Sequence, residues 1–343
     1  MNALLFLPVI ISFVITLYLL PFWISRAKII GLVGKDINKY EKPEVVEVGG
    51  IAVIAGFVIG ILFYIAVRTF ILEDINGVSL QIFVLISSIL ILAFIGLVDS
   101  LLATSSNSAI SHHIKNWRRG LRRRHRIFLC LVASIPLMAI NAGTSVMNVP
   151  FFGAVNFGIL YPLILIPLGI IGATTTYNFL AGFNGLEAGQ GIIILSFLSF
   201  VAYATGNSWL AVVGLCFVAS LIAFFIFNKN PAKVLPSDVL TYPLGGLIAI
   251  MAILGNFEKI AVIVFIPYII EFILKSRGRL TKQSFGIPEK NGNLKMPYDK
   301  IYGMTHLAIF VVGKLKKKVT ENDVVYFIFA IQILFVLLGF LVL

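Results

Sequence analysis

The sequence predicts an all-α integral membrane protein of about ten transmembrane helices, with its active-site loops on the cytoplasmic side. Three observations lead to this prediction. The 343 residues are 59% hydrophobic and 12% charged, with a mean hydropathy of +1.01, whereas a soluble domain is about half apolar and a quarter charged. The apolar residues gather in long runs. The Lys and Arg residues are concentrated in every second polar segment between these runs.

Each expected span is an apolar run that approaches the length of about 20 residues needed to cross a bilayer. The first run, residues 3–24, is too long for a signal peptide, and no basic stretch precedes it and no small-residue cleavage site follows it. The fourth and sixth runs are short. In chain order the ten spans are expected at residues 3–24, 49–67, 81–98, 127–142, 157–177, 191–205, 208–227, 240–256, 259–275 and 323–343.

The basic residues predict which side faces the cytoplasm. All of the 27 Lys and Arg residues except Arg68 and Lys259 lie in, or at the rim of, every second connection, namely 25–48, 99–126, 178–190, 228–239 and 276–322. Cytoplasmic loops carry an excess of Lys and Arg, so these connections are expected in the cytoplasm and both termini outside. An even number of spans agrees with that arrangement.

The net charge of +12 and the two cysteines exclude other classes of protein. In a soluble chain such a charge would suggest nucleic-acid binding, but here it follows the membrane topology. Cys130 and Cys216 lie in apolar runs without partner spacing, so the sequence indicates neither a disulfide framework nor a zinc site.

The segment "YNFLAGFNGLEAGQG" at 177–191 interrupts two apolar runs with two Asn, a Glu, a Gln and several Gly. A solvated loop is the plain interpretation of such a break. However, Asp99 and Asp238 also stand at the inner ends of spans, where a carboxylate next to hydrocarbon is costly unless it serves a site. Together, the side chains expected around one cytoplasmic cleft offer hard oxygen ligands, which suit Mg²⁺ shared with substrate phosphates. They are Asp99, Asn178, Asn184, Glu187 and Asp238.

The motif "NFLAGFNGLEAGQ" closely resembles one in the polyprenyl-phosphate N-acetylhexosamine-1-phosphate transferases. Within that superfamily the chain is most similar to the eukaryotic and archaeal dolichyl-phosphate UDP-N-acetylglucosamine phosphotransferase branch. Further stretches agree with it in order: "GKDINK", "GLVDS", "NPAKVLPSDV", "GRLTKQSFGIP" and "NGNLKMPYDK". The resemblance covers most of the chain and implies the same ten-span topology.

The reaction that this resemblance implies takes place at the cytoplasmic face. A lipid phosphate attacks the β-phosphorus of UDP-N-acetylglucosamine, releases UMP and leaves N-acetylglucosaminyl-diphospho-dolichol, the first lipid-linked intermediate for protein N-glycosylation. Such a transfer depends on positioning and charge neutralisation. The expected cofactor is Mg²⁺, with Mn²⁺ as the alternative ion.

Residue roles carry over from the family by position. Asn178 and Asp238 match the magnesium ligands, and with Asp99 they form the expected catalytic group. The expected substrate-binding residues are Lys35, Asp36 and Ile37 over the nucleoside, Asn184 at the uracil, Glu47 and Glu187 at the substrate, Arg126 at the lipid phosphate, and Thr281, Lys282 and Gln283 at the sugar and diphosphate.

Three positions depart from the family pattern. The usual pair of adjacent Asp residues is Asp99–Ser100, the usual Gly-Asp-Thr or Gly-Asp-Ser is "SDV" at 237–239, and an Asn is replaced by Thr175. The metal-binding carboxylate remains, but its surroundings carry fewer polar groups, which tune metal affinity. The resemblance therefore leaves the turnover rate open.

Two cytoplasmic loops are long within this single polytopic domain, residues 1–343. In 105–126, apolar residues at helical spacing beside many Arg predict a basic interfacial helix that binds anionic lipid headgroups. In 276–322, Asn291-Gly292 predicts a hairpin, and 301–319 predict a further helix that ends in "KLKKK" at the membrane surface.

Two alternatives remain open at this point. One is a sibling transferase for another UDP sugar or polyprenyl lipid, and the other is an ion-coupled transporter, which would place its polar breaks near the middle of the bilayer. The expected partners are UDP-N-acetylglucosamine, dolichyl or polyprenyl phosphate and membrane lipids, without nucleic acid, and a homodimer is left open. The location would be the cell membrane in an archaeon and the endoplasmic reticulum in a eukaryote.

Overall fold

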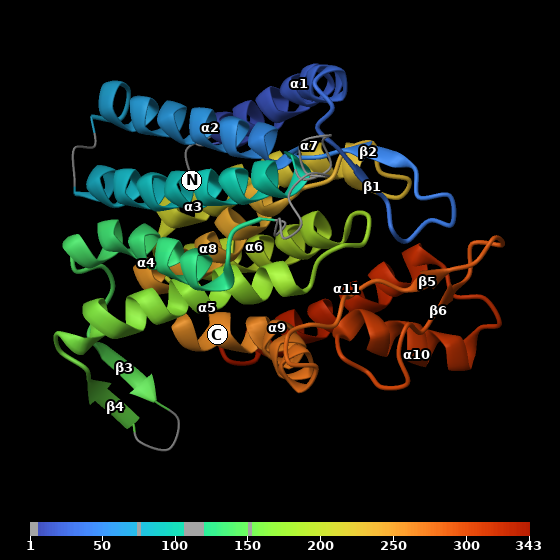
Figure 1. Cartoon of the computed structure of the whole chain (residues 1–343). Coiled ribbons are helices and arrows are strands. Elements are labelled where there is room, and N and C mark those ends of the chain that lie inside the picture. The colour runs from blue at the N-terminus through green and yellow to red at the C-terminus, as the bar shows by residue number, and fades with distance from the viewer. Residues whose placement is uncertain (1–5, 74–76, 106–119, 150–152) are drawn as a thin grey trace.

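The computed structural model describes residues 6–73, 77–105, 120–149 and 153–343. The chain forms a bundle of long helices with three short hairpins at its ends (Figure 1). The helices are α1 Leu7–Ile29, α2 Gly50–Phe70, α3 Val78–Ser105, α4 Arg123–Ala139, η3 Tyr161–Leu165, α5 Ile166–Phe179, α6 Leu186–Ala204, α7 Ser208–Asn228, α8 Asp238–Gly255, α9 Glu258–Arg277, α10 Met304–Leu315 and α11 Glu321–Phe340. The strands are β1 Val33–Lys35, β2 Glu44–Val46, β3 Val146–Val149, β4 Gly153–Asn156, β5 Ile287–Pro288 and β6 Leu294–Lys295.

Eight of the described helical segments are long and apolar enough to cross a bilayer, with η3 and α5 counted as one. Two other helices occupy the places of the fourth and ninth expected spans. The first, α4, has 17 residues, and α9 carries five charged residues among its 20. The all-α membrane fold is therefore confirmed, and the count of ten spans stays a prediction.

Helix α8 forms the centre of the bundle. Almost all of its residues are buried, and it packs mainly against α3 and α5, whereas α1 and α11 lie at the periphery with most of their surface exposed. Close packing of α3 requires Gly96, because a Cβ there would stand 2.2 Å from the carbonyl oxygen of Asp238. The same holds for α1 and α2, where Gly56 and Gly60 face Thr16 and Ser12, in the GxxxG spacing that lets membrane helices approach.

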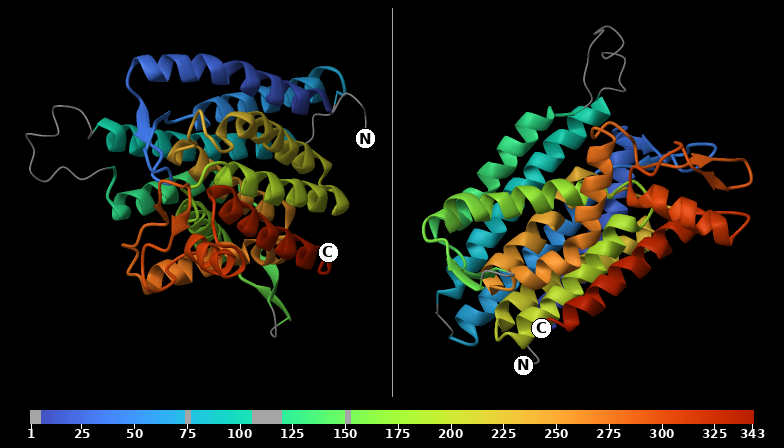
Figure 2. Two further views of the ribbon diagram at one scale, coloured as in Figure 1. Left: turned by 90° about the vertical axis from the view of Figure 1, so that its right-hand side faces the viewer. Right: turned by 90° about the horizontal axis from the view of Figure 1, so that it is seen from below.

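The two ends of the bundle differ. Hairpins β1–β2 and β5–β6 lie at one end, and β3–β4 lies at the other (Figures 1 and 2). Helix α1 begins and α11 ends at the β3–β4 end (Figure 2). We call the end with β1–β2 and β5–β6 the polar end. An even number of crossings would place both helix termini on one side, as they are here.

The structure confirms two predictions for the large loop and corrects one boundary. Strands β5 and β6 pair antiparallel around Gly292, and α10 is the expected additional helix. The polar segment 178–190, in contrast, is non-helical only at residues 180–185: α5 ends at Phe179 and α6 begins at Leu186, since Gly185 with φ of +81° starts a new helix. The expected interfacial helix in 105–126 lies largely outside the described residues.

Candidate active site

A cavity of about 370 Å³ opens at the polar end of the bundle, between the loop after β1, the α5–α6 loop and the start of α8. It brings together eight residues that the sequence predicts for the site: Lys35, Asp36, Ile37, Glu47, Asn178, Asn184, Glu187 and Asp238. Four of them are carboxylates, and Lys35 is the one cation among the described residues that line the cavity. An anionic ligand would therefore need a further positive charge there.

The cavity continues into a cluster of polar side chains from three helices. Asp238, the first residue of α8, interacts with the carboxylate of Asp99 on α3 and accepts a hydrogen bond from Asn178 at the end of α5. The Oδ1 atom of Asn178 in turn accepts from Thr241 Oγ1 at 3.1 Å. Convergence of Asp99, Asn178 and Asp238, which sequence spacing could not show, is therefore a feature of the structure.

Ser100 and Ser237 hold the start of α8 in place. The Ser100 hydroxyl accepts from the backbone N–H of Asp238 at 3.2 Å. Ser237 has a left-handed backbone, with φ of +55°, and its hydroxyl accepts from the N–H of Val48 at 2.9 Å. The two serines that depart from the family pattern thus bind backbone groups beside Asp238.

Arg126 on α4 lies on the other side of Asp99. Its Nη1 atom is 3.3 Å from Asp99 Oδ2 and donates to the hydroxyl of Tyr242 at 3.2 Å. That hydroxyl donates to Asp99 Oδ2, also at 3.2 Å, and Asp99 Oδ1 accepts from the N–H of Leu121 at 2.6 Å. Asp99 is therefore paired with Arg126 and accepts hydrogen bonds from Tyr242 and Leu121.

The α5–α6 loop is held by Glu187, in the first turn of α6. Its Oε1 atom accepts from the N–H of Gly182 at 2.8 Å, while Oε2 is buried without a hydrogen-bond partner among the described residues. Gly182 has φ of +109°, and a Cβ there would collide with the ring of Phe285. Glycine at 182 is thus required both by its backbone and by its neighbour.

Asn184 has a fixed side-chain orientation. Its Nδ2 atom donates to Asp36 Oδ2 at 2.8 Å, and both residues are buried beside the cavity. The Oδ1 atom then remains as a hydrogen-bond acceptor on the cavity wall. Such an acceptor fits a ligand with an N–H group.

A second cavity of about 190 Å³ adjoins the first and shares Asn178, Ala181 and Phe285 with it. Lys282 and Gln283 line it, as expected for residues that reach a ligand. Thr281 does not line either cavity, because its hydroxyl donates to the carbonyl of Gly278 at 2.9 Å and so closes a turn.

The segment that lines the second cavity is held by buried groups that the sequence did not indicate. Lys275 donates to the carbonyl of Lys282 at 3.1 Å and to Ser284 Oγ at 2.6 Å, and it pairs with Glu271 at 3.7 Å. Glu271 also accepts from the N–H of Met304 at the start of α10. These contacts connect α9, residues 282–284 and the start of α10, and so hold the wall of the second cavity in place.

The donor set indicates what kind of cation the site would hold. Among the described residues no three His, Cys, Asp or Glu side chains lie close enough to form a metal site of their own. Asn178 and Asp238 supply only two hard oxygen donors. This fits Mg²⁺, which is commonly bound by one or two carboxylates and completed by water and substrate phosphates.

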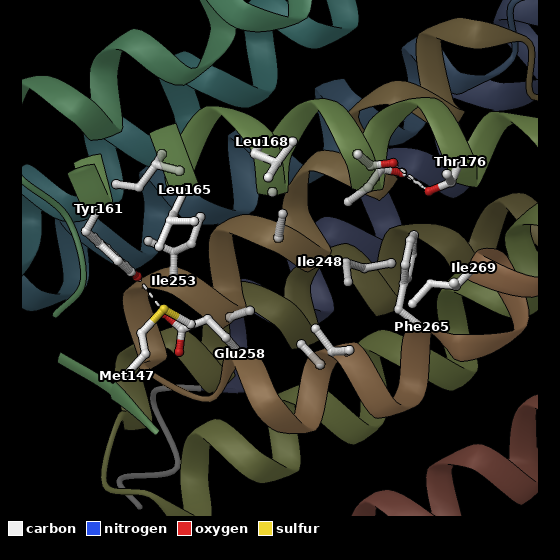
Figure 3. A pocket seen from close by; sticks show the side chains of 18 of the residues that line it. Met147, Tyr161, Leu165, Leu168, Thr176, Ile248, Ile253, Glu258, Phe265 and Ile269 are labelled. Carbon is white, nitrogen blue, oxygen red and sulfur yellow. Dashed lines mark hydrogen bonds between the residues drawn. The ribbon is translucent and has the colours of Figure 1, made fainter. Parts of the chain in front are cut away.

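An apolar groove of about 450 Å³ runs between α5, α8 and α9 toward this site. Figure 3 shows its lining, from Tyr161 and Glu258 at one end, where their side chains are hydrogen-bonded at 2.6 Å, to Thr176 at the other. Thr176 precedes Asn178 by two residues in α5. The groove therefore extends toward the end of α5 that carries Asn178, and its walls suit a hydrocarbon chain.

Comparisons with known proteins relate the chain to one family of transferases. The model of a family described as glycosyl transferase family 4 matches residues 82–256, just over half of the chain. A protein from Saccharolobus solfataricus, provisionally named UDP-N-acetylglucosamine–dolichyl-phosphate N-acetylglucosaminephosphotransferase, is 37% identical over 97% of this chain and 95% of its own length. The Saccharomyces cerevisiae protein of that name is 30% identical over 71% of this chain and 60% of its own length. A phospho-N-acetylmuramoyl-pentapeptide-transferase from Clostridium beijerinckii is 27% identical over 79% of this chain and 80% of its own length.

Proposed function

The chain belongs to glycosyl transferase family 4, and we propose that it transfers N-acetylglucosamine 1-phosphate from UDP-N-acetylglucosamine to dolichyl phosphate with the help of Mg²⁺. It is a multi-pass integral membrane transferase. The observation that carries the proposal is that a polar cavity lined by Asn178 and an apolar groove that reaches Thr176 both lie along the C-terminal part of α5. A reaction between a water-soluble nucleotide sugar and a membrane lipid needs a polar and an apolar site close to each other.

The nucleoside would occupy the main cavity beside Asn184. Because Asp36 holds the amide nitrogen of Asn184, the Oδ1 atom is presented as an acceptor. The N3 position of uracil carries a hydrogen, whereas that of cytosine does not. This orientation therefore favours a uridine nucleotide over a cytidine nucleotide.

The lipid would lie in the groove with its phosphate near Arg126. The groove walls are apolar side chains of α5, α8 and α9. Contact with a polyprenyl chain would remove the apolar surface of both from water, which is favourable. Arg126 is held by Asp99 and Tyr242, so its guanidinium is oriented before the lipid phosphate arrives.

Asn178 and Asp238 would hold the Mg²⁺ ion. When bound, the ion would neutralise the diphosphate and stabilise the charge on the departing UMP. This matters here because the cavity wall carries four carboxylates and one lysine among its described residues.

The chain's own residues then have to position the two substrates. An oxygen of the lipid phosphate forms a bond to the β-phosphorus, and the bond between that phosphorus and the oxygen shared with the α-phosphate breaks. A phosphomonoester, with a second pKa of about 6, is largely dianionic at neutral pH, so no residue has to remove a proton from it. Lys282 and Gln283, which line the second cavity, would contact the sugar and diphosphate.

The proposal is tested with the purified full-length protein in lipid nanodiscs containing dolichyl phosphate. With Mg²⁺ and UDP-N-acetylglucosamine labelled in the sugar, we expect label in the organic-solvent extract and an equal amount of UMP. Parallel reactions with other UDP sugars and with undecaprenyl phosphate separate the sibling activities. Absence of labelled lipid with every donor and acceptor would contradict the proposal.

The transporter alternative predicts a different result. It would carry UDP-N-acetylglucosamine or an ion across proteoliposomes without forming a lipid product. The break between α5 and α6 lies at one end of the bundle, whereas a transporter of broken helices would place it near the middle. We therefore keep the transferase as the proposal.

A further inference from the structure

The first turn of α11 carries polar residues that a simple membrane anchor would not need. Most of α11 is exposed on the outside of the bundle. Glu321, its first residue, is nevertheless 4% exposed and lies at the polar end. A buried carboxylate is costly unless it is paired and hydrogen-bonded, so its partners indicate its purpose.

Both carboxylate oxygens of Glu321 bind loops of the main cavity. The Oε1 atom accepts from the backbone N–H of Asn184 at 2.7 Å. The Oε2 atom pairs with the ammonium of Lys39, which also donates to Asn230 Oδ1 at 2.6 Å. Glu321 thus connects the α5–α6 loop to the loop after β1, and Lys39 extends this connection to the loop before α8.

These two loops are the ones that present Asn184 and Asp36 to the cavity. Asp36 lies close enough to Glu321 to repel it, and Lys39 offsets the two negative charges. The hydrogen bond between Asn184 Nδ2 and Asp36 Oδ2 depends on both loops keeping their places. The ion pair of Lys39 and Glu321 fixes that relation from outside the cavity.

Helix capping does not explain Glu321. A capping box formed by Thr320 and Asp323 already satisfies the start of α11, and Asp323 pairs there with Lys316. The helix therefore carries two Lys–carboxylate pairs in its first turn. In the first pair Glu321 is buried and Lys39 is partly exposed against the cavity loops, whereas the second pair is more exposed and serves the helix.

We infer that Glu321 and Lys39 are positioning residues for the nucleoside half of the active site, and that α11 sets the affinity for uridine nucleotides through them. The inference rests on the proposed function, because it takes the main cavity to be the nucleotide site. It assigns no chemical step to either residue. Glu321 acts through the backbone of Asn184, and Lys39 acts through Glu321.

Binding of UMP to the full-length protein in detergent, measured by titration calorimetry, tests the inference. Glu321→Gln removes the charge and turns an amide toward the Lys39 ammonium, and Lys39→Met leaves the buried carboxylate without its cation. Hydrogen bonds to charged groups are stronger than neutral ones, so each variant should hold the two cavity loops less firmly. We therefore expect the Kd for UMP to rise about tenfold in each variant. The matched controls Lys316→Met and Asp323→Asn, in the neighbouring pair, should change the Kd by less than about twofold, even where they lower the melting temperature.

Steady-state kinetics give a second readout that loss of stability alone would not produce. The KM for UDP-N-acetylglucosamine should rise with the Kd for UMP, while kcat and the KM for dolichyl phosphate stay near wild type. An unchanged UMP Kd in both Glu321→Gln and Lys39→Met, or equal changes in the two controls, would overturn the inference alone. If Glu321→Gln does not fold, the Kd of Lys39→Met decides the test. Lys39 is partly exposed, so its replacement should disturb folding less than replacement of the buried Glu321. Failure of the wild-type protein to bind UMP would overturn the proposed function itself.

Discussion

Replacement of Tyr242 by Phe removes one hydroxyl from the centre of the proposed phosphate site. That hydroxyl donates to Asp99 and accepts from Arg126, each at 3.2 Å. Hydrogen bonds to charged groups contribute about 1.5–3 kcal/mol each. The direct contact between Arg126 and Asp99 at 3.3 Å remains in the variant, so we expect a net loss of about 1.5 kcal/mol, or about tenfold in rate.

The loss should appear on the lipid side of the reaction. Because Arg126 is proposed to meet the lipid phosphate, kcat/KM for dolichyl phosphate should fall about tenfold, while the KM for UDP-N-acetylglucosamine stays unchanged. Tyr64→Phe is the matched control, since Tyr64 is also buried but lies about 20 Å along α2 from its start at the polar end. Wild-type kinetics in Tyr242→Phe, or an equal loss in Tyr64→Phe, would refute the reasoning.

Three further variants probe the remaining parts of the site and its support. Asp238→Asn keeps the shape of the side chain but removes the charge proposed to hold Mg²⁺, so the rate should fall about a thousandfold or more, and near-wild-type turnover would remove Asp238 from the metal site. Ser100→Ala loses one neutral hydrogen bond to the N–H of Asp238, so its rate should stay within about tenfold of wild type, and a larger loss would mean that the hydroxyl does more than hold the backbone. Burial, followed by the nearby Lys275 ammonium, lowers the pKa of His306 from 6.5 to about 4. Folding therefore favours neutral His306, and this stabilisation is present above pH 6.5 and is lost as the pH falls toward 4. Melting temperatures across this range should fall more steeply in wild type than in His306→Gln, and parallel curves would exclude the effect.

Much of the fold could be predicted from the sequence because bilayer spans impose a length and an apolar composition that single windows detect. Helices stand at all ten expected places in the described chain. Hairpin β3–β4 was not predicted, and neither were the exact starts of η3–α5 and α6. The sequence patterns that mark these elements are short. A glycine such as Gly185 can stand at the start or at the end of a helix, so it does not fix the boundary.

The candidate site was predictable where polar residues interrupt apolar runs. Asn178, Asn184, Glu187 and Asp238 stand out in this way, and the structure gathers them around one cavity. Tyr242 did not stand out, because a tyrosine in an apolar run usually only fills space. Only its position one turn after Asp238, facing Asp99, reveals a polar role.

Glu321 could have been found by the argument already applied to Asp99 and Asp238. It is a carboxylate at the end of an apolar run, and such a carboxylate is costly without a partner. Its partners, however, lie 137 and 282 residues away in the chain. Contacts at such separations come from packing of the bundle, and no local pattern in one sequence encodes them.

The destination of the β-phosphorus of UDP-N-acetylglucosamine tests the central claim most directly. In the proposed reaction this phosphorus is transferred together with the sugar. Wild-type protein supplied with Mg²⁺, dolichyl phosphate and donor labelled in the β-phosphorus should therefore place the label in the lipid, and label in the α-phosphorus should remain in UMP. Transfer of the sugar alone would leave both labels in released UDP. Sugar-labelled lipid without the β-phosphorus label would contradict the account.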